Sequence, residues 1–532
     1  MSRLILVVLF IVSLTFASYI RNPDGSITLE NVNAYLSDDL ASDVIFFQDY
    51  IKSEQFQIEE CRKILPILYS EIFSRSPQSF NWDLLLERAT ETIQNLFLTR
   101  MELRNKLDTF ILNKDTDLDA PHEDECVTSI RDAFRVMRSI EDYLGLVYLR
   151  KNPETLENHP DYLTGTLPFY KTTAFDGESI FDPSKPNFGF QSGDIILSRG
   201  NAYASAVIAR VAEREGQFSH NTLIYVDELT NIAYTIEAHI EIGVNVRPFS
   251  EGHFKDGNMR AMVFRYKGDP RIAHEAAKYM FNYAFNIAEF IPYDIHLNDE
   301  DDSELNCTEV IRSGYKHGSD IIGIPIRPIP IFKSKLSTKI PRVLKYLEIE
   351  KSFSYMPHDL ELDTRFEVIG EWTNYNKLVS SRYQDAILTT MFRWMNQDDL
   401  NYDLEATITG LFGSTLFWFL RKIPGPDSWF GLEEKFPANM PRSTIKLIPS
   451  FDQVARTLEN YLKKLDDDYL SFRDSNYLIM TIPELYNALE AFRTKDYLAW
   501  KTCGKSSAFH DFFHPANETR PDCNTQSADS RR

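Results

Sequence analysis

The chain has 532 residues, of which 43% are hydrophobic and 13% aromatic, so it is long enough and apolar enough to fold as two or three globular domains. Its 57 basic and 78 acidic residues give a formal charge of -21, which favours an acidic, well-solvated surface. No basic cluster is prominent enough to bind a phosphate backbone, so we expect no nucleic-acid partner, and an anionic lipid surface would repel the chain.

The N-terminus has the pattern of a secretory signal. Arg3 precedes an apolar run from Leu4 to Phe16, and the small residue Ala17 fits a cleavage site directly after it. The run is shorter than the roughly 20 residues of a spanning helix, so an uncleaved membrane anchor is the less favoured interpretation. We therefore expect a secreted, periplasmic or endolysosomal protein.

Export affects how the five cysteines are interpreted, because an odd number leaves one thiol unpaired in an oxidising compartment. Cys61 and Cys126 fall in one helical region, and Cys503 and Cys523 fall in the C-terminal tail, so each pair can close locally. Cys307 is then the unpaired cysteine. The alternative is that Cys307 is a buried structural thiol and that the pairing differs.

Hydrophobic periodicity divides the rest of the chain. Apolar residues at helical spacing dominate both flanks, whereas a stretch rich in Pro, Asn, Asp and Gly separates the first flank from the centre. The apolar run Leu411–Leu420 is too short to span a bilayer and favours a core helix over a membrane-touching hairpin. We predict a signal peptide (1–17), a helical domain (18–150), a wrapping linker (151–190), a central domain (191–330), a C-terminal helical domain (331–500) and a tail (501–532).

The central domain alternates strand and helix patterns, which predicts an α+β fold with helices packed on a mostly antiparallel sheet. The expected strands are Gly193–Ser198, Phe218–Val226, Ile232–Ala238 and Met259–Tyr266, and the expected helices are Ala204–Glu215, Ile272–Asn286 and one that starts at Cys307.

These expected elements carry three residues with reactive side chains, a cysteine, a histidine and a glutamate. Cys307 begins an amphipathic helix, where the helix dipole and backbone N–H groups favour the thiolate. His220 stands at the start of one strand, and Glu237 lies within the next. A thiol, an imidazole and a carboxylate are the parts that a Cys-His-acid triad needs.

The order GDIILS, FSH, IEA, PYD and NCTEV resembles the circularly permuted branch of the NlpC/P60 papain-like superfamily, the YaeF/YiiX-type amidases, over about Gln191 to Pro330. The resemblance implies that Cys307 is the nucleophile, His220 the general base and Glu237 the residue that orients the histidine. His239 lies two positions after Glu237 on the same strand face and is the competing third member.

The same resemblance places Tyr293 and Asp294 in the PYD element that precedes the cysteine helix, and Glu309 two positions after the nucleophile. Asn306 stands where an aromatic residue usually precedes the cysteine, and Thr308 replaces the usual serine. We expect Tyr293, Asp294 and Asn306 to contact the substrate.

These residues predict a cysteine hydrolase that cleaves amide or isopeptide bonds through a thioester, with a peptide or a small amide as substrate. One alternative is a lipid acyl hydrolase or acyltransferase similar to lecithin:retinol acyltransferase, and another is a non-catalytic module that binds peptide or lipid. No cofactor is expected. A metal is not expected either, because no HExxH or CxxC motif occurs and His510 and His514 suit a solvated or structural pair. The sequence indicates no stable membrane span and no particular oligomeric state.

Overall fold

The computed structural model describes residues 39–521, apart from residues 74, 76–79, 113–124, 158–167, 174–178, 180, 241, 253–257, 287–290, 300, 339, 403–439, 441, 473–477 and 508. The expected signal peptide, the run Leu411–Leu420 and Cys523 lie outside the described residues. The chain forms two compact units, one made of residues 1–119 and 123–148, the other of residues 120–122 and 149–532.

The described part of the first unit is helical. It contains α2 (Leu40–Lys52), α3 (Ile58–Lys63), α4 (Leu65–Phe73), α5 (Trp82–Glu87), α6 (Ala89–Leu107), the short π-helix η3 (Asp108–Leu112) and most of α7 (Glu125–Lys151). Asp39 caps α2 by accepting a hydrogen bond from the backbone of Ala41. Helix α2 packs against α6, and its residues Val44, Phe47 and Ile51 are fully buried.

Two long-range links hold the first unit together. The expected disulfide between Cys61 and Cys126 is present and joins α3 to α7. Arg100 of α6 donates to both carboxylate oxygens of Glu141 on α7 at 2.9 Å, and both side chains are fully buried. Removal of either charge alone would leave an uncompensated buried ion, which typically destabilises a protein by about 3–5 kcal/mol.

A seven-stranded antiparallel sheet organises the second unit, with the strand order β1-β9-β6-β2-β3-β4-β5. The α+β expectation is confirmed. The strands are β1 (Tyr170–Thr172), β2 (Ile195–Gly200), β3 (His220–Val226), β4 (Ala233–His239), β5 (Gly243–Pro248), β6 (Asn258–Tyr266) and β9 (Phe366–Thr373). Their central residues are almost all buried, which explains their near-continuous apolar runs.

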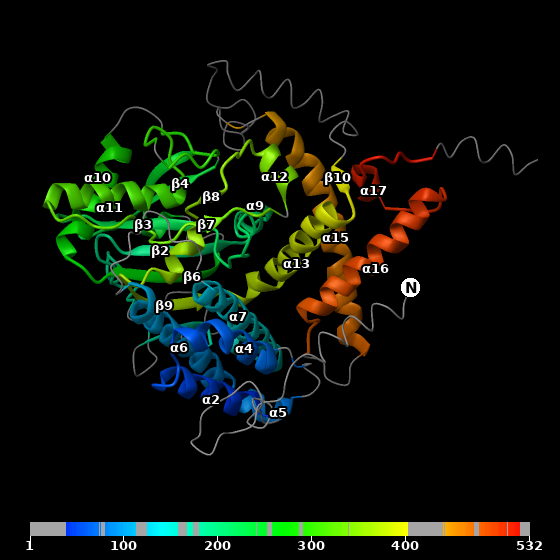
Figure 1. The fold of residues 1–532 in the computed structure, drawn as a ribbon, viewed down its shortest axis with the longest axis horizontal. Coiled ribbons are helices and arrows are strands. Elements are labelled where there is room, and N and C mark those ends of the chain that lie inside the picture. The colour runs from blue at the N-terminus through cyan, green and yellow to red at the C-terminus, as the bar shows by residue number, and fades with distance from the viewer. Residues whose placement is uncertain are drawn as a thin grey trace, which may run out of the picture. The chain divides into compact units, whose positions relative to one another are not determined.

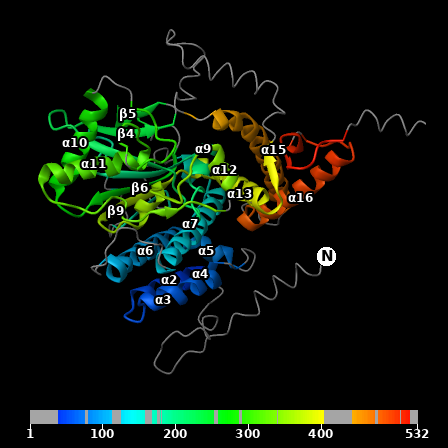
Figure 2. The ribbon, with the colours of Figure 1, turned by 45° about the horizontal axis from the view of Figure 1, so that its top comes forward.

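Helices α10 (Pro270–Asn286) and α11 (Cys307–Ile322) pack against each other, and α11 also contacts β3 and β4 (Figures 1 and 2). The close approach of the two helices depends on glycine. A Cβ atom at Gly318 would lie 2.5 Å from the carbonyl oxygen of Ile272, and one at Gly314 would lie 2.8 Å from Met280. Gly323, in the left-handed conformation at φ 74°, ends α11.

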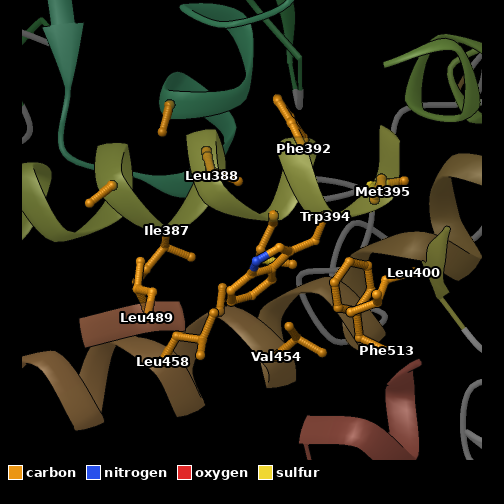
Figure 3. Packing of buried hydrophobic residues seen from close by; sticks show 14 of the residues in the cluster. Ile387, Leu388, Phe392, Trp394, Met395, Leu400, Val454, Leu458, Leu489 and Phe513 are labelled. Atoms are coloured by element: carbon orange, nitrogen blue, oxygen red, sulfur yellow. The ribbon is translucent and has the colours of Figure 1, made fainter. Parts of the chain in front are cut away.

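The C-terminal part of the second unit is built around α13 (Tyr375–Gln397), α15 (Arg442–Phe472) and α16 (Ile482–Lys501). Their shared core contains the fully buried Trp394, with Leu458 and Leu489 from the neighbouring helices (Figure 3). The smaller elements are α8 (Glu154–Glu157), α9 (Tyr203–Ile208), η4 (Phe249–Glu251), β7 (Ser334–Lys335), α12 (Pro341–Tyr346), β8 (Phe353–Ser354), η6 (Pro357–Leu362), β10 (Leu400–Tyr402), α17 (Phe509–Phe512) and β11 (Phe513–Pro515). No described helix is both long enough and apolar enough to cross a membrane.

Two expectations about element boundaries differ from the structure. The helix expected over Ala204–Glu215 ends at Ile208, because the backbone of residues 211–213 instead pairs with residues 335–337. The sheet also extends beyond the expected central domain of 191–330. Strand β1 comes from the expected linker, and β9 comes from the expected C-terminal helical domain, where it pairs with β6.

Candidate functional site

Cys307 is the first residue of α11 and the free cysteine of the described chain, with an exposed fraction of 3%. Asn306 caps the helix, because its Oδ1 accepts hydrogen bonds from the backbone N–H groups of Thr308 and Glu309 at 2.9 and 3.1 Å. The Glu309 carboxyl group accepts a hydrogen bond from the backbone N–H of Asn306 at 2.7 Å and completes a capping box. The thiol therefore sits at a fixed, positively polarised helix end.

His220 reaches this helix end from the first position of β3, where it lies opposite Ser198 in the sheet. The next residue, Asn221, donates from Nδ2 to the Thr308 hydroxyl at 3.1 Å and so ties the strand to the start of α11. The imidazole of His220 is hydrogen-bonded to the Cys307 side chain. Two residues that are 87 positions apart in the sequence are thus in contact.

Glu237 is fully buried in β4 and holds the far side of the His220 ring. Its Oε2 lies 3.1 Å from Nε2 of His220 and 3.2 Å from Nε2 of His239. Because Nε2 of His220 faces the carboxylate, Nδ1 is the ring nitrogen that remains for the thiol. The same carboxylate oxygen approaches both imidazole rings, whose centroids lie 5.1 Å apart, and it accepts a hydrogen bond from Nε2 of His220.

The electrostatics of these three groups depend on one another. Burial alone would lower the pKa of His220, but the hydrogen bonds and charges of Cys307 and Glu237 outweigh burial and raise that pKa to about 10. Burial would raise the pKa of Cys307, but His220 lowers it below its usual value. The pKa of Glu237 is likewise held well below its usual value by His220 and His239, despite burial. This arrangement favours a thiolate beside an imidazolium.

The three expected substrate contacts lie together around a cavity that Cys307 also lines, although their surroundings differ. Asp294 is buried, and its carboxylate accepts hydrogen bonds from the backbone N–H groups of His296 and Asn298, so it shapes the loop before α11. Tyr293 is 8% exposed. The Nδ2 of Asn306 is buried and has no hydrogen-bond partner among the described residues, which leaves an N–H donor beside the nucleophile.

The cavity beside Cys307 has a volume of about 400 Å³, within the usual range of small-molecule sites. Its walls are predominantly apolar. One group of lining residues comes from α9 and the segment that follows it, including Val207, Ile208 and Val211. A second group comes from the C-terminal part, including Leu347, Phe392, Met440, Leu447 and Phe451. The second group carries no sequence motif, and only its apolar character could have indicated a binding role.

His510 and His514, which the sequence places four positions apart, both contact protein groups. His510 is buried, and its Nδ1 lies 2.8 Å from Oδ2 of Asp496, so it has a structural partner, whereas Nδ1 of His514 lies 3.0 Å from the Pro515 carbonyl. In the part of the chain that the structure describes, the group whose ligand atoms could surround a metal ion is His220, Glu237 and His239, with those atoms within 4.8 Å of one another. In the structure Oε2 of Glu237 lies within 3.2 Å of Nε2 of both histidines.

No protein-family model matches this sequence, and no curated protein or solved structure matches it either.

Proposed function

We propose that this protein is a cysteine hydrolase with a permuted papain-like domain, which cleaves an amide bond through Cys307, His220 and Glu237. The observation that carries the proposal is the hydrogen-bonded chain from the Cys307 side chain to His220 and from Nε2 of His220 to Glu237 at 3.1 Å. A nucleophile, a base and a group that orients the base, each held by a regular element, form the arrangement used in covalent acyl transfer.

In the first half of the reaction, the Cys307 thiolate attacks the substrate carbonyl carbon and a C–S bond forms. The tetrahedral intermediate collapses with cleavage of the C–N bond, and the imidazolium of His220 gives its proton to the departing amine. In the second half, His220 takes a proton from water as the hydroxide attacks the thioester. The C–S bond then breaks, a carboxylic acid leaves and the thiolate is restored.

Two donors are available for the oxyanion of each tetrahedral intermediate. The backbone N–H of Cys307 lies at the start of α11, and Nδ2 of Asn306 is the buried donor without a partner among the described residues. Loss of one such donor typically lowers kcat by about 10²–10³-fold. Asn306 would then both cap the helix through Oδ1 and bind the oxyanion through Nδ2.

We also propose that the protein works in a secreted, periplasmic or endolysosomal compartment. The Cys61–Cys126 disulfide supports this, because structural disulfides persist mainly in oxidising compartments.

Alkylation of the purified protein with iodoacetamide across pH tests the proposed mechanism. We expect alkylation of Cys307 with an apparent pKa below the ~8.5 of a free thiol, and a higher apparent pKa in His220→Ala. Unshifted or absent labelling would overturn the hydrolase proposal and favour a module that binds without turnover.

A further inference from the structure

The cavity that adjoins Cys307 has a chemical character that the triad alone does not require. An amidase for peptides needs polar groups that pair with the N–H and C=O groups of its substrate, because burial of an unpaired amide is unfavourable. The cavity instead offers mostly side-chain carbons from Val207, Leu347, Ile349, Met356 and Phe392.

Most polar side chains around the cavity are already engaged within the protein. The Thr308 hydroxyl accepts a hydrogen bond from Asn221, and the Thr444 hydroxyl donates to the carbonyl of Tyr346. The carboxylates of Asp294 and Asp452 accept, respectively, from backbone N–H groups and from the Arg456 guanidinium. The cavity therefore retains few groups for a polar ligand.

Among the lining residues that the structure describes, two fully buried side-chain polar atoms have no hydrogen-bond partner. One is Nδ2 of Asn306, next to the nucleophile, and the other is the buried hydroxyl of Tyr402. So few available donors suit a ligand that has one polar group and is otherwise apolar. The Asn306 donor lies next to Cys307, so the polar head belongs at the thiol.

We propose that this cavity binds the long aliphatic chain of a fatty acyl substrate and presents its carbonyl carbon to Cys307. The proposal rests on the hydrolase function above and adds the class of acyl group that Cys307 receives. The substrate is then either an N-acyl amide or an acyl ester of a lipid. In both cases the C–S bond forms at the acyl carbon, the C–N or C–O bond breaks, and a free fatty acid leaves after hydrolysis of the thioester.

The activity on substrates with acyl groups of increasing length tests the proposal. p-Nitrophenyl esters and p-nitroanilides with acetyl, butyryl, octanoyl and palmitoyl groups would be compared, so that the two series separate ester from amide cleavage. We expect kcat/KM to rise by about fourfold per methylene until the cavity is filled. A flat or falling series in both arms would overturn the acyl-chain site.

Two matched variants test whether the acyl chain of the substrate lies in this cavity. Val207 and Val379 are both half-buried and both pack against the same hydrophobic core, but Val207 lines the cavity and Val379 does not. Val207→Phe should lower the ratio of palmitoyl to acetyl kcat/KM by more than tenfold, whereas Val379→Phe should leave the ratio unchanged. Equal ratios in the two variants would overturn the assignment.

A binding measurement separates failure of this proposal from failure of the hydrolase. Fluorescence of cis-parinaric acid would be titrated with the wild type and with Cys307→Ser, with palmitate and hexanoate as competitors. Binding with preferential displacement by palmitate supports the acyl site even if no substrate is cleaved. Cleavage of acetyl substrates without parinaric acid binding would retain the hydrolase and overturn the acyl site.

Discussion

Glu237 and Glu309 are both buried near Cys307, yet the pKa values of their carboxyl groups shift in opposite directions. Two histidines hold the pKa of Glu237 well below its usual value despite burial. For Glu309, burial and the negative charge of Asp294 raise the pKa to about 9. Burial is common to both residues, so the neighbouring charge decides which carboxyl group is ionised at neutral pH.

Glu237 and Glu309 therefore have different roles. The Glu237 carboxylate is charged and stabilises the imidazolium of His220, whereas the Glu309 carboxyl group is protonated and serves the helix cap through the N–H of Asn306. Glutamine can replace a protonated carboxyl group with little change in charge, but it cannot replace a carboxylate. Substitutions at the two positions should therefore have very different effects.

The largest effect is expected for Glu237→Gln. Loss of the carboxylate lowers the pKa of His220 and so raises that of Cys307, which should reduce substrate turnover by about 10²–10⁴-fold, as in other triads that lose the orienting acid. The matched control is Glu309→Gln, which keeps a capping-box residue and should change turnover by less than about threefold. Similar losses in both variants, at unchanged Tm, would contradict the assigned charges.

Asn306→Ser tests the role of the Nδ2 donor of the residue that caps α11. Serine retains a hydroxyl that can cap α11, but it lacks the Nδ2 donor. We expect kcat to fall by about 10²-fold or more while the rate of iodoacetamide alkylation and Tm stay near those of the wild type. A parallel loss of alkylation would show that the residue acts on the thiolate rather than on the oxyanion.

The pH profile of hydrolysis should have two limits. Activity should rise through the lowered pKa of Cys307 and fall as the pH passes through about 10, where His220 loses the proton needed by the leaving group. Because the folded pKa of His220 is raised, its stabilising contribution is complete below the unfolded value of ~6.5 and is lost as pH rises through about 10. Thermal unfolding at several pH values, compared with His220→Ala, checks the second statement.

The smallest effect is expected for His239→Ala. The variant removes one of two partners of Glu237, so the pKa of Glu237 should rise, but the contact between Glu237 and His220 remains. We expect turnover to fall by less than about tenfold, because Glu237 still accepts the hydrogen bond that orients His220. A loss equal to that of Glu237→Gln would make His239 an equal member of the triad.

Much of the sheet could be predicted from sequence because its strands are short apolar runs with polar ends. Strand β3 begins at His220, and helix α11 begins at Cys307, within two residues of where the pattern places each. Helix α9 is shorter than its sequence pattern predicts, because residues 211–213 pair with a segment more than 120 positions later, which no local pattern encodes. Strand β9 cannot be predicted for the same reason, since only its pairing with β6 identifies it as part of the sheet.

The candidate site also has a part that the sequence predicts and a part that it does not. The polar residues could be predicted, since Cys307, His220 and Glu237 each have a chemistry that is recognisable on its own. The cavity could not, because Phe392, Met440 and Leu447 are ordinary apolar residues that acquire a role only when distant segments come together. Shape and apolar surface arise from tertiary packing, whereas reactive groups are visible one residue at a time.

The extent of the cavity wall along the chain has a consequence for biosynthesis. Its lining residues run from Tyr203 to Asp452, whereas all three residues of the proposed triad have been made once residue 307 is added. A ribosome therefore releases all three triad residues more than 140 positions before the last part of the wall. The segment that carries Cys307 is therefore synthesised before the last part of the cavity wall, and the cavity is completed after it.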